Sequence, residues 1–382
     1  MLYSDLWVLG DNEHLMSIEA DDNGIITRIS FKDAHVNPDS QSFFVAPGFI
    51  DTHIHGAFGV DTSDHDPEAI CVMARKLASI GTAAFLPTTM TISSDDIHKC
   101  CESVSKAKEI LKKSSDPYSQ ILGIRLEGPV FNPSKCGVQD PRYCIDPSEG
   151  MKLISDLDKE FPDLIKIIDI SPELDGSIDL IEKFKDRFVF SLAHTEADHD
   201  IAQRALNSGA KSITHALNAM PPILKRNTGV LAAALDNGSY IEVISDLHHI
   251  DTAMIRLLYS DVFDGKVITI SDSMRGALMP DGIYDLGGTD VEVKGGRTYY
   301  GPDRDLAGSV TCLAEEFRKL MGLGIDKKRV IDSLTLNPLM RMGLEDSPCV
   351  PGVLEVGRPA TFNVFDKEYN FIRIINCGQE IG

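Results

Sequence analysis

Histidines and carboxylates stand at the ends of short apolar runs at six positions along the chain. These residues are His53, His55, Glu127, His194, His215 and Asp272. Imidazole and carboxylate groups together bind Zn²⁺ or Fe²⁺, and they can leave a coordination position open for water. The chemistry that these residues could do is therefore metal-assisted hydrolysis.

The two histidines of the first run are spaced for joint use. His53 and His55 are two residues apart, and in a strand this spacing points both side chains to the same side. A single histidine at the end of a strand is more often a packing residue than a ligand. Six such side chains at the ends of five runs are much harder to explain in that way. The pattern predicts a divalent metal ion, Zn²⁺ or Fe²⁺, with one or two ions per subunit.

Eight apolar, β-branched runs could position these side chains. They span residues 49–54, 82–88, 121–127, 164–170, 188–194, 212–215, 240–246 and 267–272. Segments with a periodicity near 3.6 residues, such as PEAICVMARKLASIG and AQRALNSGA, lie between most of them. Eight strands that alternate with helices favour an α/β fold of the (β/α)8 TIM-barrel type over an open sheet. The catalytic side chains of such a barrel lie at the carboxyl ends of its strands, where the six residues stand.

Both ends of the chain have β character. The runs LWVLGD, HLMSIEAD and GIITRIS are separated by Asp, Asn and Gly, and β character returns after Gly343 in GVLEVGRPATFNVFD and FIRIINCGQEIG. We expect residues 1–47 and 345–382 to form one small β-sandwich domain beside a barrel of residues 48–344. Within the barrel, residues 273–305 form a long excursion, and helices are expected near 306–322 and 326–337.

The composition limits the partners and the compartment. The net charge is −21, from 58 acidic and 37 basic residues, and no basic stripe typical of a phosphate-backbone binder is present. No apolar run approaches about 18 residues, and the first residues lack a basic segment followed by an apolar stretch. The eight cysteines include no CxxC pair. We therefore expect no nucleic-acid partner, no membrane span, no signal peptide and a cytoplasmic protein.

Several segments resemble a known family. PGFIDTHIHGAFGVD is similar to the opening motif of the amidohydrolase superfamily. LEGPVFNPSKCGVQDP, AHTEAD, THALNAMPP, ISDLHHID and SDS together resemble the N-acetylglucosamine-6-phosphate deacetylases within it, and GVLEVGRPATFNVFD is similar to the superfamily's C-terminal β segment. The similarity spans nearly the whole chain. It implies hydrolysis of N-acetylglucosamine 6-phosphate to glucosamine 6-phosphate and acetate.

The resemblance implies a role for each predicted metal ligand. Glu127, His194 and His215 match the ligands of the principal ion. His53 and His55 match the pair that supports a second ion in members that have one. Glu127 also occupies the bridging position that a carboxylated lysine fills in dihydroorotase-like relatives.

The resemblance further implies the catalytic and substrate-binding residues. Asp272 matches the catalytic aspartate, which would deprotonate a metal-activated water and then protonate the departing amine. Asn218, Ala219 and Arg226 match the segment that holds the sugar phosphate, and guanidinium suits phosphate well. His249 matches a substrate-contacting histidine. Similar proteins are commonly homodimers in which this arginine reaches the neighbour's site, so we expect a homodimer that acts on a small amino-sugar phosphate.

One position departs from the family pattern. After LEGP the family usually places a histidine that contacts the substrate near the amide, whereas this chain has Gln139. Glutamine can still donate a hydrogen bond, but it cannot become cationic. We expect Gln139 to contact the substrate, and the change leaves the efficiency and the identity of the sugar open.

Two alternatives remain beside the deacetylase hypothesis. One is deacetylation of another N-acetylated amino-sugar phosphate, such as the galactosamine epimer, or of another amide. The other is an inactive homologue kept as a binding or regulatory protein. The intact set of six histidines and carboxylates argues against inactivity, because burying such polar groups is costly.

Overall fold

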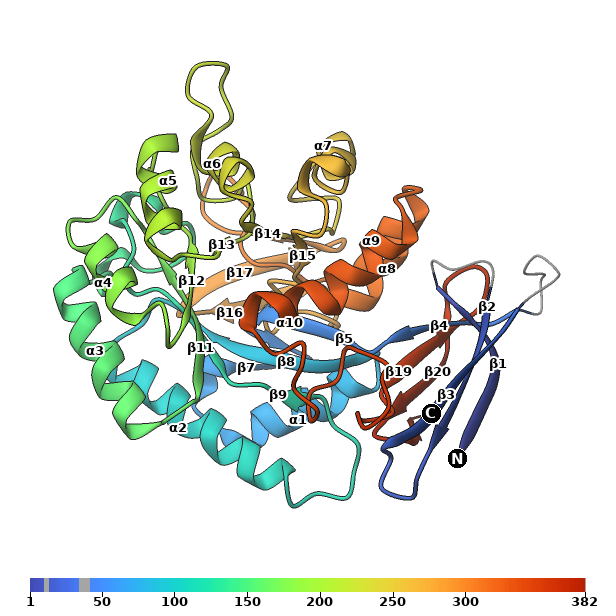
Figure 1. Cartoon of the computed structure of the whole chain (residues 1–382). Helices are drawn as coiled ribbons and strands as arrows, with labels where there is room; N and C mark the ends of the chain where they lie inside the picture. The colour runs from blue at the N-terminus through green and yellow to red at the C-terminus, as the bar shows by residue number, and fades with distance from the viewer. Residues whose placement is uncertain (10–13, 34–41, 382) are drawn as a thin grey trace.

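Eight parallel strands form a nearly closed barrel at the centre of the molecule (Figure 1). The computed structural model describes residues 1–9, 14–33 and 42–381. In chain order the barrel strands are β5 (Phe49–Ile54), β8 (Thr82–Thr89), β10 (Ile124–Glu127), β11 (Ile165–Ile170), β12 (Val189–Leu192), β13 (Ser212–Ile213), β14 (Tyr240–Val243) and β15 (Val267–Thr269). Each pairs with the next in parallel, and β9 (Gln120–Ile121) adds a short pairing to β8. The predicted (β/α)8 barrel is confirmed.

The barrel closes between its first and last strands. Just beyond β15, Ser273 forms a parallel bridge with Ile54. The backbone N–H of His55 donates to Ser273 O (2.9 Å), and that of Asp272 donates to His53 O (2.9 Å). Two segments that carry predicted site residues are therefore held side by side at this seam.

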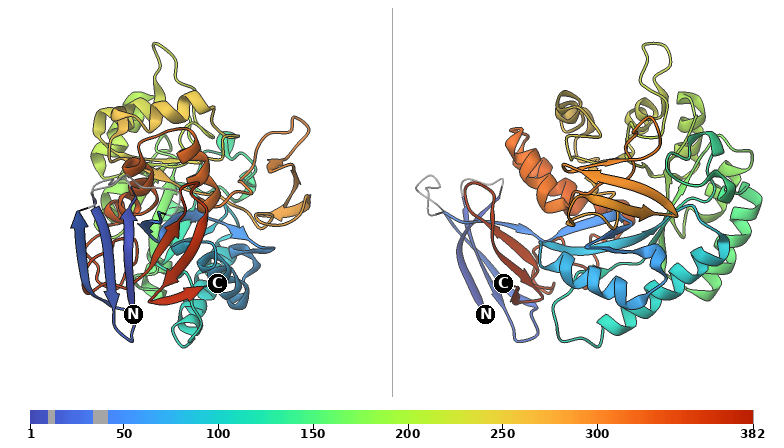
Figure 2. Two further views of the ribbon diagram at one scale, coloured as in Figure 1. Left: turned by 90° about the vertical axis from the view of Figure 1, so that its right-hand side faces the viewer. Right: turned by 180° about the vertical axis from the view of Figure 1, so that it is seen from behind.

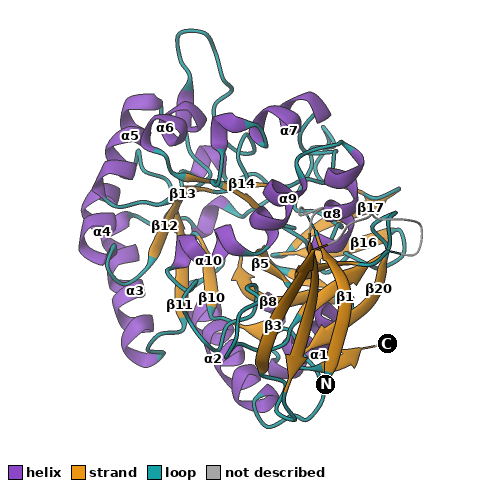
Figure 3. Cartoon of the chain, turned by 45° about the vertical axis from the view of Figure 1, so that its right-hand side comes forward, coloured by secondary structure: helices purple, strands orange, loops and turns teal. Residues whose placement is uncertain are grey.

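Helices cover the outer face of the barrel (Figure 3). They are α1 (Pro67–Ala78), α2 (Ser94–Leu111), α3 (Pro147–Glu160), α4 (Ser177–Phe184), α5 (His199–Ser208), α6 (Gly229–Asn237), α7 (Thr252–Leu258), α8 (Leu313–Gly322), α9 (Lys327–Leu334) and α10 (Leu336–Met342). Helix α1 shows why they form. Asp66 caps its first turn by accepting from Glu68 N, and Ile70, Met73 and Leu77 are buried on one face. The helices expected near 306–322 and 326–337 correspond to α8, α9 and the start of α10.

The two ends of the chain form one seven-stranded sheet beside the barrel. Its strands, in spatial order, are β21 (Gln379–Ile381), β20 (Phe371–Asn376), β19 (Phe362–Phe365), β4 (Phe44–Pro47), β1 (Leu2–Val8), β2 (His14–Ala20) and β3 (Ile26–Asp33). The sheet folds over on itself, because Ile26 N donates to Arg358 O and Ala360 N donates to Gly24 O, both at 2.8 Å. The rings of Tyr3 and Phe362 meet inside it, with centroids 5.0 Å apart. The predicted β unit built from both termini is confirmed.

The excursion after the last barrel strand contains elements that we did not predict. A three-stranded antiparallel sheet projects from the side of the barrel (Figure 2), formed by β16 (Gly282–Leu286), β17 (Thr289–Lys294) and β18 (Arg297–Tyr299). Smaller elements are the hairpin of β6 (Gly56–Ala57) and β7 (Val60–Asp61) and the 3-10 helices 62–64, 133–135, 141–143 and 261–263. Over the described residues, no helix has the length and hydropathy that crossing a membrane requires.

Candidate metal centre

The six predicted ligands come together at the carboxyl-end mouth of the barrel. Each is buried, and each stands at the end of its strand or within three residues of it. They form two adjacent groups in which every ligand atom lies within 4.8 Å of the others: His53, His55 and Asp272 in one, and Glu127, His194 and His215 in the other. Side chains from five strands thus meet at one place, as the sequence predicted.

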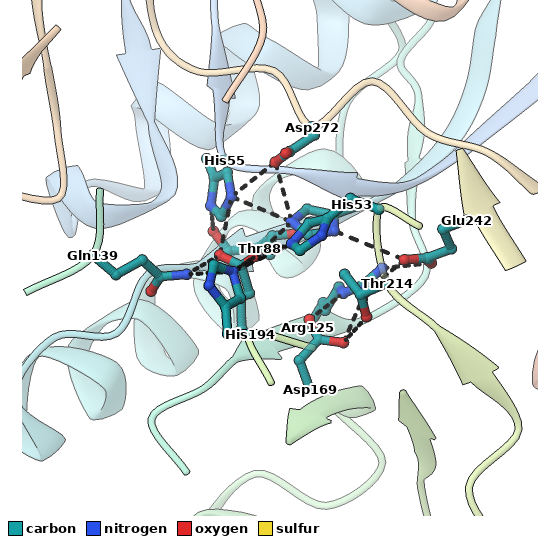
Figure 4. Close-up of polar contacts among 12 residues, drawn as sticks. His53, His55, Thr88, Arg125, Gln139, Asp169, His194, Thr214, Glu242 and Asp272 are labelled. Atoms are coloured by element: carbon teal, nitrogen blue, oxygen red, sulfur yellow. Dashed lines mark hydrogen bonds and ion pairs between the residues drawn. The ribbon is translucent and has the colours of Figure 1, made fainter. Parts of the chain in front are cut away.

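The first group has the spacing of metal ligands (Figure 4). His53 Nε2 and His55 Nε2 are 3.3 Å apart, and each lies 3.3 Å from Asp272 Oδ1. Two ligand atoms about 2.05 Å from a zinc ion, at a tetrahedral angle, are about 3.3 Å apart. The three atoms therefore fit around one ion.

The second group has the same spacing. Glu127 Oε1 lies 3.2 Å from both His194 Nε2 and His215 Nε2, and the two nitrogens are 3.2 Å from each other. Glu127 also faces the first group, because its Oε1 is 3.5 Å from His53 Nε2 and its Oε2 is 3.4 Å from His55 Nε2. A carboxylate placed between two such groups can serve one ion or bridge two.

Backbone contacts orient two of the rings. The Nδ1 atom of His194 lies 2.8 Å from Lys135 O, and that of His55 lies 3.3 Å from Thr88 O. A ring that donates from Nδ1 to a carbonyl presents a free Nε2 lone pair to a metal ion. The donor set and its orientation therefore fit a divalent cation.

The backbone at three site residues lies in the left-handed region. The φ angles are 45° at His194, 30° at His215 and 48° at Asp272. Such conformations cost a non-glycine residue on the order of 1–3 kcal/mol and cluster at functional sites. At His194, His215 and Asp272 the left-handed residue lies within three residues of the end of its barrel strand, and its side chain lies in the mouth of the barrel.

The charges of the site favour a bound cation. Burial alone would raise the pKa of Glu127, but His53 and His194 hold it well below its ordinary value. Burial lowers the pKa of His55, yet Asp272 and Glu127 raise it to about 9. Burial likewise lowers the pKa of His215, which Glu127 and Asp272 raise to about 9. Two carboxylates, Glu127 and Asp272, are thus buried among these rings and supply negative charge that a cation would offset.

A buried charge network that the sequence analysis missed lies beneath the ligands (Figure 4). Arg125 donates to both oxygens of Asp169, at 2.8 Å each, and to both oxygens of Glu242, at 2.6 and 2.7 Å. Arg341 also donates to Glu242. Asp169 comes within metal-ligand range of His53, but its oxygens are occupied by Arg125 and by the Thr214 hydroxyl. We therefore do not count it as a ligand.

A cavity of about 460 Å³ opens over the site. Among the predicted substrate-binding residues, Gln139, Asn218, Ala219 and His249 line it. Other lining residues, which the sequence analysis missed, are Met90, Leu286, Tyr300 and residues 305–308. The cavity is large enough for a monosaccharide-sized ligand.

His249 is held by a carboxylate that the sequence analysis also missed. Its Nδ1 lies 2.8 Å from Asp246 Oδ2, and its backbone N–H donates to Asp246 Oδ1 at 2.9 Å. Burial would raise the pKa of Asp246, but the hydrogen bonds from His249 lower it to about 2. This contact fixes the ring with Nε2 as its remaining polar atom. The segment ISDLHHID carries the signal, since an Asp three residues before a His can close such a turn.

Arg226 is not brought to the cavity of its own chain. It lies on the loop before α6, where residues 222–227 are exposed, and it borders a separate shallow cavity with Asp198 and Asp200. In Figure 1 this loop projects above α6. Within one chain, Arg226 is therefore separate from the other predicted substrate residues.

The chain is similar to known proteins in its sequence and in its fold. A model of the amidohydrolase family matches residues 44–377. The chain is 36% identical over 335 residues to "N-acetylglucosamine-6-phosphate deacetylase" of Bacillus subtilis, covering 87% of this chain and 83% of that protein. It is 29% identical to "N-acetylgalactosamine-6-phosphate deacetylase" of Escherichia coli O157:H7, covering 88% and 87%. A solved N-acetylglucosamine-6-phosphate deacetylase from Thermotoga maritima superposes with a TM-score of 0.86 at 26% identity, covering 100% and 99%.

Proposed function

The chain belongs to the amidohydrolase family, and on that premise we propose that it hydrolyses N-acetylglucosamine 6-phosphate to glucosamine 6-phosphate and acetate. The observation that carries the proposal is the meeting of four histidines and two carboxylates at the mouth of the barrel. The galactosamine epimer is the second candidate, because one relative carries that name. The glucosamine compound comes first, since the relative named for it has the higher identity, 36% against 29%.

The proposal gives each ligand group a part. Glu127, His194 and His215 would hold the principal divalent ion, Zn²⁺ or Fe²⁺, and His53 and His55 would support a second. A bound ion of this kind supplies Lewis acidity toward the amide carbonyl and the attacking water. The contacts of the His194 and His55 rings with backbone carbonyls keep the Nε2 atoms of both rings pointing toward the ligand groups.

Asp272 is the proposed general base and acid. Its Oδ1 lies 3.3 Å from both His53 Nε2 and His55 Nε2 and borders the cavity where an amide would sit. The carboxylate takes a proton from the attacking water as the new C–O bond forms. It then gives that proton to the amine nitrogen as the C–N bond breaks, which yields acetate and the free amino sugar.

The sugar phosphate would be held by groups around the cavity. His249 presents Nε2, while Asn218 and Ala219 line the same cavity. We propose that the protein is a homodimer in which Arg226 of the partner subunit completes the phosphate site. The exposed loop that carries Arg226 supports this, since Ile223 and Leu224 on it are 44% and 56% exposed.

We also propose a cytoplasmic location, which suits eight free cysteines. The domain boundaries that we propose are those predicted from the sequence, at residues 47 and 345.

The test combines metal analysis with an assay of the ligand variants. Glu127→Ala, His194→Ala and His215→Ala should each lose the principal ion and nearly all turnover, because three protein ligands are the minimum for an open site. His53→Ala and His55→Ala should be milder if one ion suffices. The purified proteins would be analysed for metal and assayed on N-acetylated sugars with and without 6-phosphate. His98→Ala removes a half-exposed histidine of α2 and is the matched control. Full metal content and normal activity in Glu127→Ala would refute the assignment.

A further inference from the structure

Both polar atoms of the Gln139 side-chain amide form hydrogen bonds within the protein, although the residue borders the cavity. The backbone N–H of Thr91 donates to Gln139 Oε1 at 2.5 Å. Gln139 Nε2 donates to Glu127 Oε2, also at 2.5 Å, and lies 3.4 Å from His194 Nε2. The residue is only 4% exposed. Its amide therefore joins the end of β8 to the carboxylate at the end of β10.

The hydrogen-bond partners fix which way the amide points. The Thr91 N–H can only donate, so the atom that faces it must be the carbonyl oxygen of Gln139. The amide nitrogen then faces Glu127, whose ionised carboxylate can only accept. Flipping the amide would set two donors against each other at Thr91 and two acceptors against each other at Glu127. The expected contact between Gln139 and a substrate therefore competes with hydrogen bonds that the side chain already makes.

The orientation of Glu127 matters because its two oxygens have different neighbours. Oε1 faces His194 and His215, whereas Oε2 faces His55. The last torsion of a glutamate side chain is broad, so packing alone fixes it weakly. A hydrogen bond to one oxygen removes that freedom, and contacts of this kind around metal ligands typically change metal affinity or activity 10- to 100-fold.

We propose that Gln139 is a positioning residue that holds the Glu127 carboxylate in the orientation required to bind metal. The proposal rests on the proposed function, because it takes Glu127 as a metal ligand. Gln139 acts through Glu127, and its own anchor is the backbone of Thr91. Glutamine suits this task because it offers an acceptor and a donor at opposite sides of one rigid group.

The test measures zinc affinity with no sugar present. Gln139→Met keeps nearly the length and volume of the side chain but removes both hydrogen bonds. We expect its Zn²⁺ affinity, measured by competition with a chromophoric chelator, to fall about 10- to 100-fold. Gln139→Asn, shorter by one methylene, should fall in the same direction and serves if the first variant does not fold. Arg142→Ala is the control, because Arg142 is exposed in the same loop and its contacts are with Asp140 and the Tyr143 ring at the surface.

Kinetic constants distinguish this role from a substrate contact. With zinc in excess, a positioning residue leaves KM for the sugar phosphate within about twofold of wild type, while kcat falls. The absorption bands of the Co²⁺-loaded protein should also shift in Gln139→Met, because they report ligand geometry. Unchanged Zn²⁺ affinity with a raised KM would overturn the proposal and leave the proposed function standing. Failure of the wild type to bind either Zn²⁺ or Fe²⁺ would instead refute the proposed function.

Discussion

At the scale of single residues, the proposed mechanism depends on a carboxylate that stays ionised while buried. Burial would raise the pKa of Asp272, but His53 and His55 lower it below its ordinary value. The carboxylate is therefore ionised throughout the neutral range, which is the form that a general base requires. An aspartate whose pKa stayed raised by burial would hold its own proton and could not act as the base.

Asp272→Asn separates the proton-transfer role from metal binding. The variant should keep its principal ion and bind substrate, but turnover should fall roughly 10²- to 10⁴-fold, because the amide cannot accept the proton of water. Stopped-flow assays on protein of verified metal content would measure this loss. Asp290→Asn, on the exposed surface of β17, is the control. Near-normal turnover by Asp272→Asn would remove this residue from the mechanism.

The residues that could be predicted are those whose chemistry alone marks them. His53, Glu127 and His194 are polar groups that are costly to bury, and they stand at the ends of apolar runs. Their residue type and position were therefore enough to predict that they lie together at the mouth of the barrel. The carboxylate behind His249 and the partners of Gln139 are contacts between side chain and backbone in folded loops, and no spacing rule supplies them. Arg125 and Glu242 were within reach, because charged residues inside buried parallel strands must pair.

At the scale of elements, the loop before α6 carries a prediction about substrate choice. Residues 222–227 are exposed, and Arg226 does not reach the cavity of its own chain. If Arg226 holds the phosphate in a partner's site, Arg226→Ala should raise KM for the 6-phosphate substrate at least tenfold, since a charge-assisted hydrogen bond is worth about 1.5–3 kcal/mol. Steady-state kinetics with the phosphorylated and the free sugar would test this.

The residue next to Arg226 provides the control for this prediction. Lys225→Ala removes the neighbouring exposed charge and should leave KM near the wild-type value. The free sugar should be a poor substrate for both proteins. Equal turnover of the phosphorylated and free sugars by the wild type would refute the phosphate-site assignment. A fully active monomer in sedimentation would refute the shared site.

The barrel strands, the backbone at their ends and the extra sheet were predictable to different degrees. The eight barrel strands follow from continuous apolar runs, which a barrel buried on both faces requires. The left-handed backbone at His194, His215 and Asp272 was not predictable, because it is imposed where each strand meets its loop. The β16–β17–β18 sheet was missed although its runs are separated by Gly287–Gly288 and Gly295–Gly296, pairs that are typical of hairpins.

At the scale of the whole molecule, one buried acid links stability to pH. Glu316 on α8 is fully buried, and its Oε2 accepts from Ser245 N at 3.1 Å. Burial raises its pKa well above the ordinary value of 4.5. The folded state therefore keeps a proton that the unfolded state has lost, and the free energy of unfolding falls as pH rises from 4.5 toward the folded pKa.

Glu316→Gln tests this link. Glutamine cannot ionise, so the variant should lose less stability than the wild type between pH 5 and pH 8. Urea midpoints of both proteins at both pH values give the difference, and other titrating groups cancel in it. Glu315→Gln changes the adjacent, half-buried acid and is the control. Equal losses in wild type and Glu316→Gln would contradict the assignment of the titration to this residue.

The contacts between the first and last barrel strands determine when the site is completed during folding. Ser271 bonds to His53 O across a separation of 218 residues, and Asp272 lies directly beside that contact. Contacts between such distant parts of a chain form late, because a long loop must be ordered before they can hold. During synthesis, the segments that carry His53 to His215 emerge before the one that carries Asp272. The site is therefore complete only when the segment that carries Asp272 has joined the first barrel strand.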